Sequence, residues 1–281
     1  MKTRIITATV AACLFIPVCY FSEYVSFPIV IGLLCLIGVF EMAKCLGFDK
    51  NYVITIPMYI IALGLPIFRF FTGNIFANKI TSSFLTIALF LFFGMLIYVL
   101  AYVMFKKNTV KVNDMLTFYA MFVYIVGCFS SIVLVRYGSG GKYMYLLVFL
   151  GAWICDSFAY FVGKFFGKHK LIPEISPKKT VEGAIGGIAF TIVGFVIFGL
   201  IVNNGFDANI SYFKLCILGL VLSIVSQIGD LIASAIKRQY EIKDYGNIFP
   251  GHGGILDRFD GVLLTAPTLF IVNTALNMLQ W

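Results

Sequence analysis

A charged segment near the end of the chain carries the residues best suited to chemistry. Residues 234–260 read SAIKRQYEIKDYGNIFPGHGGILDRFD and lie between two apolar runs. The chain as a whole is apolar, with 60% hydrophobic and 12% charged residues. Charges of both signs at a membrane boundary are costly to keep, and such clusters usually mark functional sites. We therefore expect the chemistry of this protein to centre on this segment.

Four aspartates could provide a cation site. Asp156 and Asp230 lie inside apolar runs, where a lone carboxylate is costly unless it is paired or bound to a cation. Asp257 and Asp260 are three residues apart, so a helix would place them on one face. Carboxylates without clustered Cys or His favour a hard cation, and Mg²⁺ is usual beside phosphates. The alternative is structural: Asp230 pairs with a base on its own helix, and Asp257 caps the next helix.

Basic residues and a glycine-rich turn could bind phosphate. The backbone N–H groups of PGHGG at 250–254 can approach an anion closely, and Arg suits bidentate contact. The basic candidates are Lys178, Lys179, Lys237, Arg238, Lys243 and Arg258. Alternatively, the two lysines at 178 and 179 follow from the positive-inside rule and from attraction to anionic lipid headgroups. The chain has no P-loop, no HExxH and no dinucleotide fingerprint. Residue chemistry alone predicts a membrane enzyme or transporter that handles a phosphorylated substrate with Mg²⁺.

Transmembrane helices must position these residues. Continuous apolar runs of about 18 residues or more are long enough to span a bilayer as helices, in which every backbone polar group has an internal partner. We expect an all-α, polytopic protein with nine spans at about 4–21, 25–43, 52–71, 84–105, 115–135, 143–163, 183–202, 211–235 and 261–280. Lys2 and Arg4 before the first run resemble a signal peptide, but we expect a retained helix.

The basic residues predict the orientation. With the N-terminus inside, five of the 21 Lys and Arg residues fall outside: Arg69, Lys79, Arg136, Lys142 and Lys214. The positive-inside rule therefore favours an N-in, C-out topology, with the charged segments on the cytoplasmic face.

The two halves of the chain differ in polar content. Residues 1–142 predict a helical scaffold, which could also make dimer or lipid contacts, and residues 143–281 predict the catalytic region. In the first half, Glu41 and Lys44 are three apart and predict a local ion pair. In the second, Gly183 and Gly187 form a GxxxG pair, which favours close helix packing.

The segment at 234–260 resembles the signature of the phosphatidate cytidylyltransferase (CDP-diacylglycerol synthase) family. The pattern is S-x-x-K-R, four residues, K-D, five residues, then P-x-H-G-G-x-x-D-R-x-D, and this chain fills every fixed position. DSFAY at 156–160 and SPKKTVEG at 176–183 also look like family motifs. Ala233 departs from the family, in which many members carry Glu. The resemblance covers the second half well, whereas the first half matches in being polytopic.

The resemblance implies that CTP and phosphatidic acid react to give CDP-diacylglycerol and pyrophosphate, with Mg²⁺ and, as an open option, a second cation. By analogy with the family, Asp230, Asp257 and Asp260 hold the metal, with Asp156 as a weaker candidate. The catalytic set is Asp230, Lys237, Arg238, Lys243, Asp244, His252, Asp257, Arg258 and Asp260. The substrate-binding set is Ser176, Lys178, Lys179, Thr180, Ser234, Gly253 and Gly254. We expect a multi-pass protein of the cell membrane with a cytoplasmic-face site, no nucleic-acid partner, and a homodimer as an option.

Three other functions share features with this sequence. A CDP-alcohol phosphotransferase resembles D-G-x-x-A-R, but here Asp260-Gly261 is followed by Val-Leu-Leu-Thr. A cytidylyltransferase or kinase acting on another membrane lipid is the closer alternative. An anion transporter is the non-enzyme alternative, because buried acids and broken helices also occur in that class.

Overall fold

The structure, a computed structural model, describes residue 13 and residues 15–75, 80–106, 110–138, 140–206, 209–249 and 253–276. Over these ranges the chain forms long helices and one short hairpin. It divides into two compact units. The first comprises Met1–Tyr137 and Asp244–Asp257, and the second comprises Gly138–Lys243 and Arg258–Trp281. The signature segment therefore contributes to both units.

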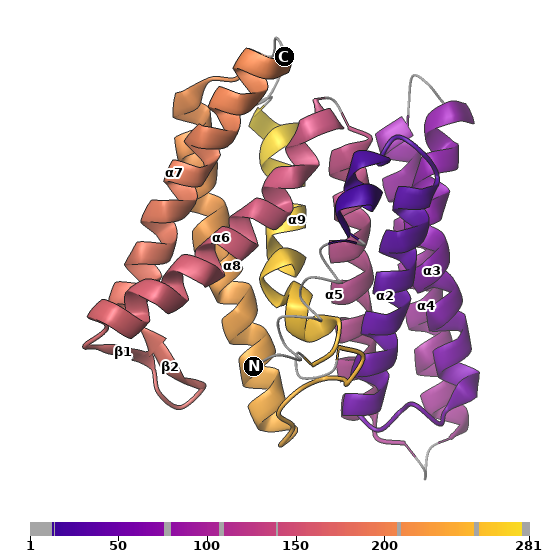
Figure 1. Cartoon of the computed structure of the whole chain (residues 1–281). Coiled ribbons are helices and arrows are strands. Elements are labelled where there is room, and N and C mark those ends of the chain that lie inside the picture. Colours follow the sequence, from indigo (N-terminus) through magenta and orange to yellow (C-terminus); the bar gives the residue numbers. More distant parts are fainter. Residues whose placement is uncertain are drawn as a thin grey trace. The chain divides into compact units, whose positions relative to one another are not determined.

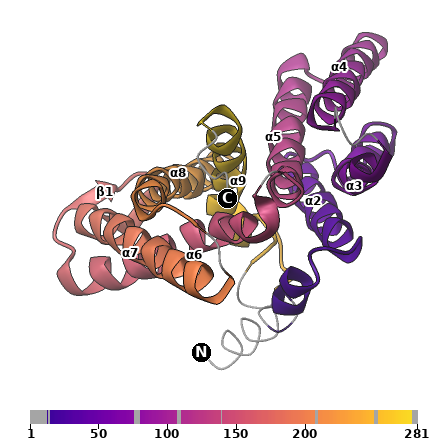
Figure 2. The same cartoon turned by 90° about the horizontal axis from the view of Figure 1, so that it is seen from above.

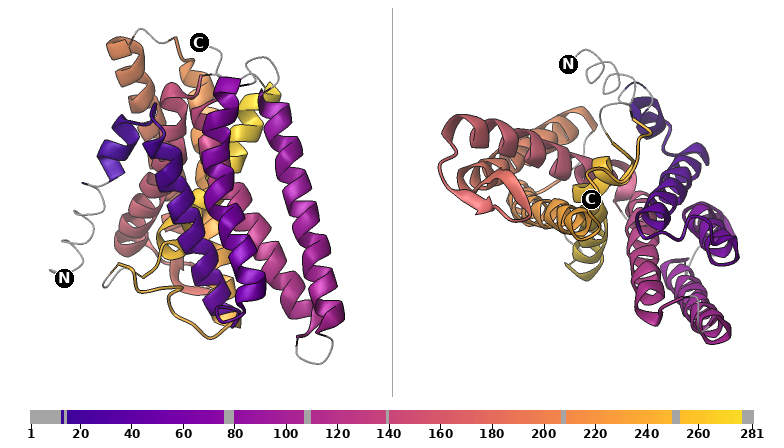
Figure 3. Two further views of the ribbon diagram at one scale, coloured as in Figure 1. Left: turned by 90° about the vertical axis from the view of Figure 1, so that its right-hand side faces the viewer. Right: turned by 90° about the horizontal axis from the view of Figure 1, so that it is seen from below.

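In the described part of the first unit, four long helices form a bundle. They are α2 (Ser26–Cys45), α3 (Tyr52–Ile75), α4 (Ile80–Phe105) and α5 (Val112–Arg136). Helix α2 packs against α3 and α5, and α4 packs against α3 and α5. The four helices run side by side in Figure 1, and Figure 2 shows the same group from above. The same grouping is seen in both views of Figure 3.

Most side chains of this bundle are apolar, both on the inside and on the outside. Phe27, Phe118 and Phe122 are fully buried in the core. Leu89 and Phe90 on α4 are 68% and 72% exposed. An apolar outer face of this kind suits lipid, because in water it would form an aggregation-prone patch.

The second unit contains the remaining elements. They are α6 (Gly141–Phe166), β1 (Lys170–Ile172), β2 (Ser176–Thr180), α7 (Val181–Phe206), α8 (Tyr212–Gln239) and all but the first two residues of α9 (Leu256–Leu276). Helix α7 packs against both α6 and α8. A Cβ on Gly187 would lie 2.9 Å from the carbonyl oxygen of Cys155, and one on Gly183 would lie 2.6 Å from that of Ala159. The predicted close-packing role of this glycine pair is thus confirmed.

Two differences from the sequence expectation concern residues of the predicted site. The segment between α6 and α7 was predicted as a loop, but it contains an antiparallel hairpin that pairs Lys170 with Thr180 and Ile172 with Ser176. Helix α8 continues to Gln239 rather than ending near residue 235, so Lys237 and Arg238 lie on a helix instead of in a loop. The extra turn arises because AIKRQ contains no helix breaker and its two bases suit a helix C-terminus.

Seven helices in the described part of the chain, α2 to α8, are long and apolar enough to cross a membrane. The fold is therefore that of an all-α, polytopic membrane protein with a small hairpin. The first predicted span, 4–21, lies largely outside the described residues. Helix α9 occupies much of the ninth predicted span but begins with the charged residues Asp257, Arg258 and Asp260.

Candidate functional site

Three aspartates from three helices of the second unit form an acidic cluster. Asp156 lies on α6, Asp230 on α8 and Asp260 on α9, and each is partly buried. Asp156 interacts electrostatically with Asp230, and Asp260 interacts with both. Like charges held together away from water repel strongly, so the cluster favours a bound positive charge.

Small residues allow the helices that carry these acids to approach one another. A Cβ on Gly229 of α8 would lie 2.6 Å from the carbonyl oxygen of Asp260. A Cβ on Gly261 of α9 would collide with the Ser226 hydroxyl of α8. Thr265 of α9 donates a hydrogen bond of 3.0 Å to the Val148 carbonyl of α6. Gly229 and Gly261, which are next to Asp230 and Asp260 in the sequence, thus allow α8 and α9 to pack closely.

Basic side chains surround the acidic cluster. Lys179 from the hairpin forms an ion pair with Asp230, and the Ser234 hydroxyl lies 3.3 Å from the other oxygen of that carboxylate. The partner of Asp230 is therefore not the base on its own helix that the structural alternative predicted. Arg258 interacts electrostatically with Asp156, and Lys237 interacts with Asp260. These cations offset part of the acidic charge and could also contact phosphate oxygens.

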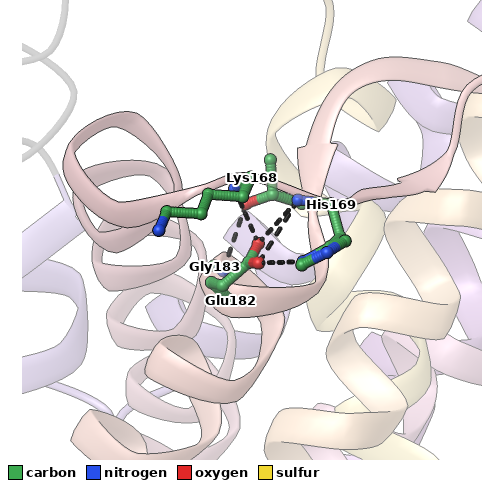
Figure 4. Close-up of polar contacts among 5 residues, drawn as sticks. Lys168, His169, Glu182 and Gly183 are labelled. Carbon is green, nitrogen blue, oxygen red and sulfur yellow. Dashed lines mark hydrogen bonds and ion pairs between the residues drawn. The ribbon is translucent and has the colours of Figure 1, made fainter.

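The hairpin that carries Lys179 is anchored by Glu182 at the start of α7. The Glu182 carboxylate accepts backbone hydrogen bonds from Lys168 and His169, and it lies 2.6 Å from Nδ1 of His169 (Figure 4). Neither Glu182 nor His169 is among the site residues that the sequence predicts. The two residues are 13 apart and are separated by a predicted loop, so no helical or strand periodicity indicates that they meet.

Further contacts join the hairpin to the helices. The Thr180 hydroxyl accepts a hydrogen bond of 3.1 Å from the Gly183 N–H, so this predicted substrate-binding residue caps α7. Arg238 of α8 donates from Nε to the Ile175 carbonyl at 3.4 Å. Lys179 and Arg238 therefore connect the hairpin to α8 at two separate points.

Asp257 belongs to the first unit, where it organises the loop before α9. Its Oδ2 atom accepts hydrogen bonds from the backbone N–H groups of Tyr245 at 2.8 Å and Gly254 at 2.9 Å. The second bond spans three residues backwards, as in a capping box. The predicted capping function of Asp257 is thus present. A carboxylate has further lone pairs, so this geometry does not exclude a cation at the same side chain.

Glu41 of α2 also binds this loop, although the sequence predicts that it pairs with Lys44. Its carboxylate accepts the N–H groups of Ile255 and Leu256, both at 2.9 Å. Lys44, its predicted partner, is exposed. The predicted local pair was therefore wrong, because the start of α9 offers two N–H donors that a surface lysine cannot match. A buried acid within an apolar run was the available signal.

The other predicted residues have varied positions. Ser176 is partly buried on β2, whereas Lys178, Lys243 and Asp244 are exposed. Gly254 is buried, and Gly253 has a φ of 83°, a conformation that favours glycine. His252 lies outside the described residues, as do Pro250 and Gly251.

The acidic cluster suits a hard cation by its donor chemistry, because all its ligand atoms are carboxylate oxygens. Within the described ranges, however, no three His, Cys, Asp or Glu side chains are arranged to hold a metal ion. Lys179 instead contacts Asp230. Mg²⁺ is therefore a proposal that rests on the type of donor atoms present.

Together, the apolar helices and the charged cluster define a polytopic membrane protein with a polar site. Comparison with known proteins assigns the family. The model described as "Cytidylyltransferase family" matches residues 2–276. The chain belongs to this family.

Curated relatives from several bacteria match almost the full length. The chain is 37% identical over 275 residues to the phosphatidate cytidylyltransferase of Bacillus subtilis (strain 168), covering 97% of each. It is 34% identical to the protein of that name from Staphylococcus haemolyticus, covering 97% of this chain and 98% of the relative. The Thermotoga maritima protein of that name is 32% identical, covering 97% of this chain and 96% of the relative.

Proposed function

We propose that this protein is a CTP:phosphatidate cytidylyltransferase. A phosphate oxygen of phosphatidic acid attacks the α-phosphorus of CTP, and a new P–O bond forms. The bond from the α-phosphorus to the oxygen bridging to the β-phosphorus breaks, so pyrophosphate leaves and CDP-diacylglycerol remains. The attacking phosphate is already ionised, and the reaction needs no side chain to remove a proton. Full-length similarity to relatives with this name supports the proposal.

The observation that carries the proposal is the acidic cluster beside the basic hairpin in the second unit. Both substrates are anions, so their approach requires positive charge near the reacting phosphates. Lys179 is already beside Asp230, and Lys237 and Arg258 act on the other two aspartates. These bases can bind phosphate oxygens while a cation satisfies the carboxylates.

Mg²⁺ is the cofactor we propose. The residues that would hold it are Asp230, Asp257 and Asp260, with Asp156 as a further candidate now that it lies in the acidic cluster. When bound, the ion would neutralise phosphate charge and orient the leaving pyrophosphate. Lys179, Lys237, Arg238, Lys243 and Arg258 are the proposed phosphate-binding residues.

We also propose that the protein lies in the plasma membrane with this site on the cytoplasmic side. The distribution of basic residues supports that orientation. CTP would then reach the site from the cytoplasm and phosphatidic acid from the inner leaflet. The family resemblance is the basis for a homodimer as a further option.

The test is pyrophosphate release by purified protein in detergent or liposomes, with CTP, Mg²⁺ and phosphatidic acid each omitted in turn. We expect release to require all three, with CDP-diacylglycerol as the lipid product. Release with a different lipid phosphate in place of phosphatidic acid would identify another lipid cytidylyltransferase. Phosphate binding without any pyrophosphate release, by monodisperse protein, would contradict the proposal and favour an anion transporter.

A further inference from the structure

Glu41 is a buried acid far in sequence from the signature segment. Glu41 lies near the end of α2 and is 2% exposed. An acid inside an apolar helix is costly unless it has polar partners. The partners here belong to a loop more than 200 residues away in sequence.

The Glu41 carboxylate binds the start of α9 through both of its oxygens. Oε1 accepts the N–H of Ile255 and Oε2 accepts the N–H of Leu256, each at 2.9 Å. The first N–H groups of a helix have no partner within the helix, and the helix dipole favours negative charge there. Two bonds to two neighbouring N–H groups fix the direction of the helix start as well as its position.

Two glycines of the same loop lie directly against this carboxylate. A Cβ on Gly246 or on Gly254 would overlap the Oε1 atom of Glu41. The positions are eight residues apart, so both ends of the loop contact one side chain. A larger residue at either position would displace Glu41 or the loop.

Asp257 binds the same loop through two other N–H groups. Its Oδ2 atom accepts the N–H groups of Tyr245 and Gly254, and its carboxylate interacts electrostatically with Glu41. Two acids thus hold the segment Tyr245–Asp257, one from α2 and one from the segment itself. Glu41 determines where this segment, and with it Asp257, is placed.

We propose that Glu41 is a positioning residue for cytidylyl transfer. By holding the N–H groups of Ile255 and Leu256, it sets the orientation of Asp257 and thereby the affinity for Mg²⁺. This inference rests on the proposed function, in which Asp257 is a metal ligand. Residues that orient a metal ligand commonly change metal affinity about 10–100-fold when mutated.

The experiment compares Glu41→Gln and Glu41→Ala with wild type in the full-length protein. Pyrophosphate release is measured against Mg²⁺ concentration, and amide exchange is followed by mass spectrometry. We expect Glu41→Gln to raise the Mg²⁺ concentration for half-maximal rate about tenfold, with recovery at saturating Mg²⁺. Peptides containing Ile255 and Leu256 should exchange faster, whereas those of α7 should not. Glu41→Ala, which has no acceptor, should show the larger change.

Matched variants separate positioning from general damage. Glu23→Gln is the same substitution at an exposed site in the first unit, and it should match wild type. Gly246→Ala places a methyl group against Glu41 and should reproduce the Mg²⁺ effect, which provides a second test if Glu41 variants do not fold. Gly94→Ala, with open space around its Cβ, is its control.

Three outcomes would overturn the inference. One is a folded Glu41→Gln enzyme with wild-type rate and Mg²⁺ dependence. Another is a loss confined to folded yield, with unchanged Mg²⁺ dependence per folded molecule, because that is a purely structural role. The third is unchanged Mg²⁺ dependence in folded Gly246→Ala when the Glu41 variants do not fold. Absence of pyrophosphate release by wild type would instead reject the proposed function, whatever amide exchange showed about the loop.

Discussion

At the scale of residues, three acids lie together on the helices α6, α8 and α9 of the second unit. Asp156, Asp230 and Asp260 would each be costly alone within apolar surroundings, and their proximity adds repulsion. A protein selected for stability alone would not bring three acids together in this way. Lys179 already pairs with one of these acids, and we propose that a positively charged ligand binds the cluster during the reaction.

Replacing Asp260 should therefore separate stability from activity. In Asp260→Asn, repulsion with Asp230 and Asp156 is lost, so the melting temperature without Mg²⁺ should equal or exceed that of wild type. Turnover should fall about 100-fold or more, as for other losses of transition-state charge stabilisation. Thermal unfolding in detergent and pyrophosphate release measure the two effects. Asp114→Asn, at an exposed position of α5, is the control and should change neither. Parallel losses of stability and activity in Asp260→Asn would argue for a structural acid.

Lys179 should contribute both to substrate binding and to stability. Its ion pair with Asp230 has side-chain exposures of 24% and 23%, and its ammonium nitrogen is buried, so loss of the lysine leaves Asp230 unpaired beside two other acids. A contact with a CTP phosphate contributes about 1.5–3 kcal/mol for a charged hydrogen bond. We expect Lys179→Met to raise the KM for CTP about tenfold or more and also to lower the melting temperature. Lys170→Met, at an exposed position of β1, should leave KM unchanged, and equal effects of the two would reject a specific role.

At the scale of elements, Glu182 is one of several anchors of the hairpin between α6 and α7, and it binds the start of that hairpin. Glu182 accepts the N–H groups of Lys168 and His169 and contacts the His169 ring (Figure 4). In Glu182→Ala these three contacts are lost, so amide exchange in residues 168–180 should accelerate and the KM for CTP should rise. Glu174→Ala removes an exposed acid from the tip of the same hairpin and is the control. Unchanged exchange in Glu182→Ala would show that the strand pairing holds the hairpin without it.

The contact between α6 and α7 depends on the absence of a side chain at Gly187. A Cβ there would lie 2.9 Å from the Cys155 carbonyl oxygen and 3.0 Å from its sulfur. Gly187→Val should destabilise the protein by about 1–3 kcal/mol, the usual cost of overpacking. Chemical or thermal unfolding in detergent measures this change. Gly205→Val, on the same helix with open space around its Cβ, should be close to neutral, and equal losses would contradict the packing explanation.

Much of the architecture was predictable because apolar runs specify membrane helices directly. The runs predicted at 52–71 and 84–105 lie inside α3 and α4. The hairpin was not predictable, because Lys-Leu-Ile and Ser-Pro-Lys-Lys-Thr carry no alternating pattern long enough to identify strands. The contacts of Glu41 and Lys179 were missed for a related reason. Each joins residues on different elements, and neither spacing nor composition indicates which distant groups will meet.

At the scale of the whole molecule, the chain order of the two units is interleaved. The second unit is interrupted by Asp244–Asp257, which belong to the first. The interruption begins after Lys243 and ends before Arg258, so it lies wholly within the signature segment. The N-terminal helices are therefore more than a scaffold in one respect: α2 supplies Glu41, which binds part of that segment.

The proposed reaction also requires the hairpin to face the cytoplasm, where CTP is available. In intact membranes, trypsin should cleave the exposed lysines Lys168, Lys170 and Lys178 in inside-out vesicles and spare them in right-side-out vesicles. The measurement is the appearance of a fragment cut near residue 170, identified by mass spectrometry. Detergent-permeabilised vesicles provide the control, since both orientations should then be cleaved alike. Because three predicted spans, an odd number, follow the hairpin in the N-in, C-out arrangement, a tag at the C-terminus should show the opposite accessibility to the hairpin. Cleavage of the hairpin from the outside would reverse the orientation, and CTP in the cytoplasm could then not reach the lysines proposed to bind it.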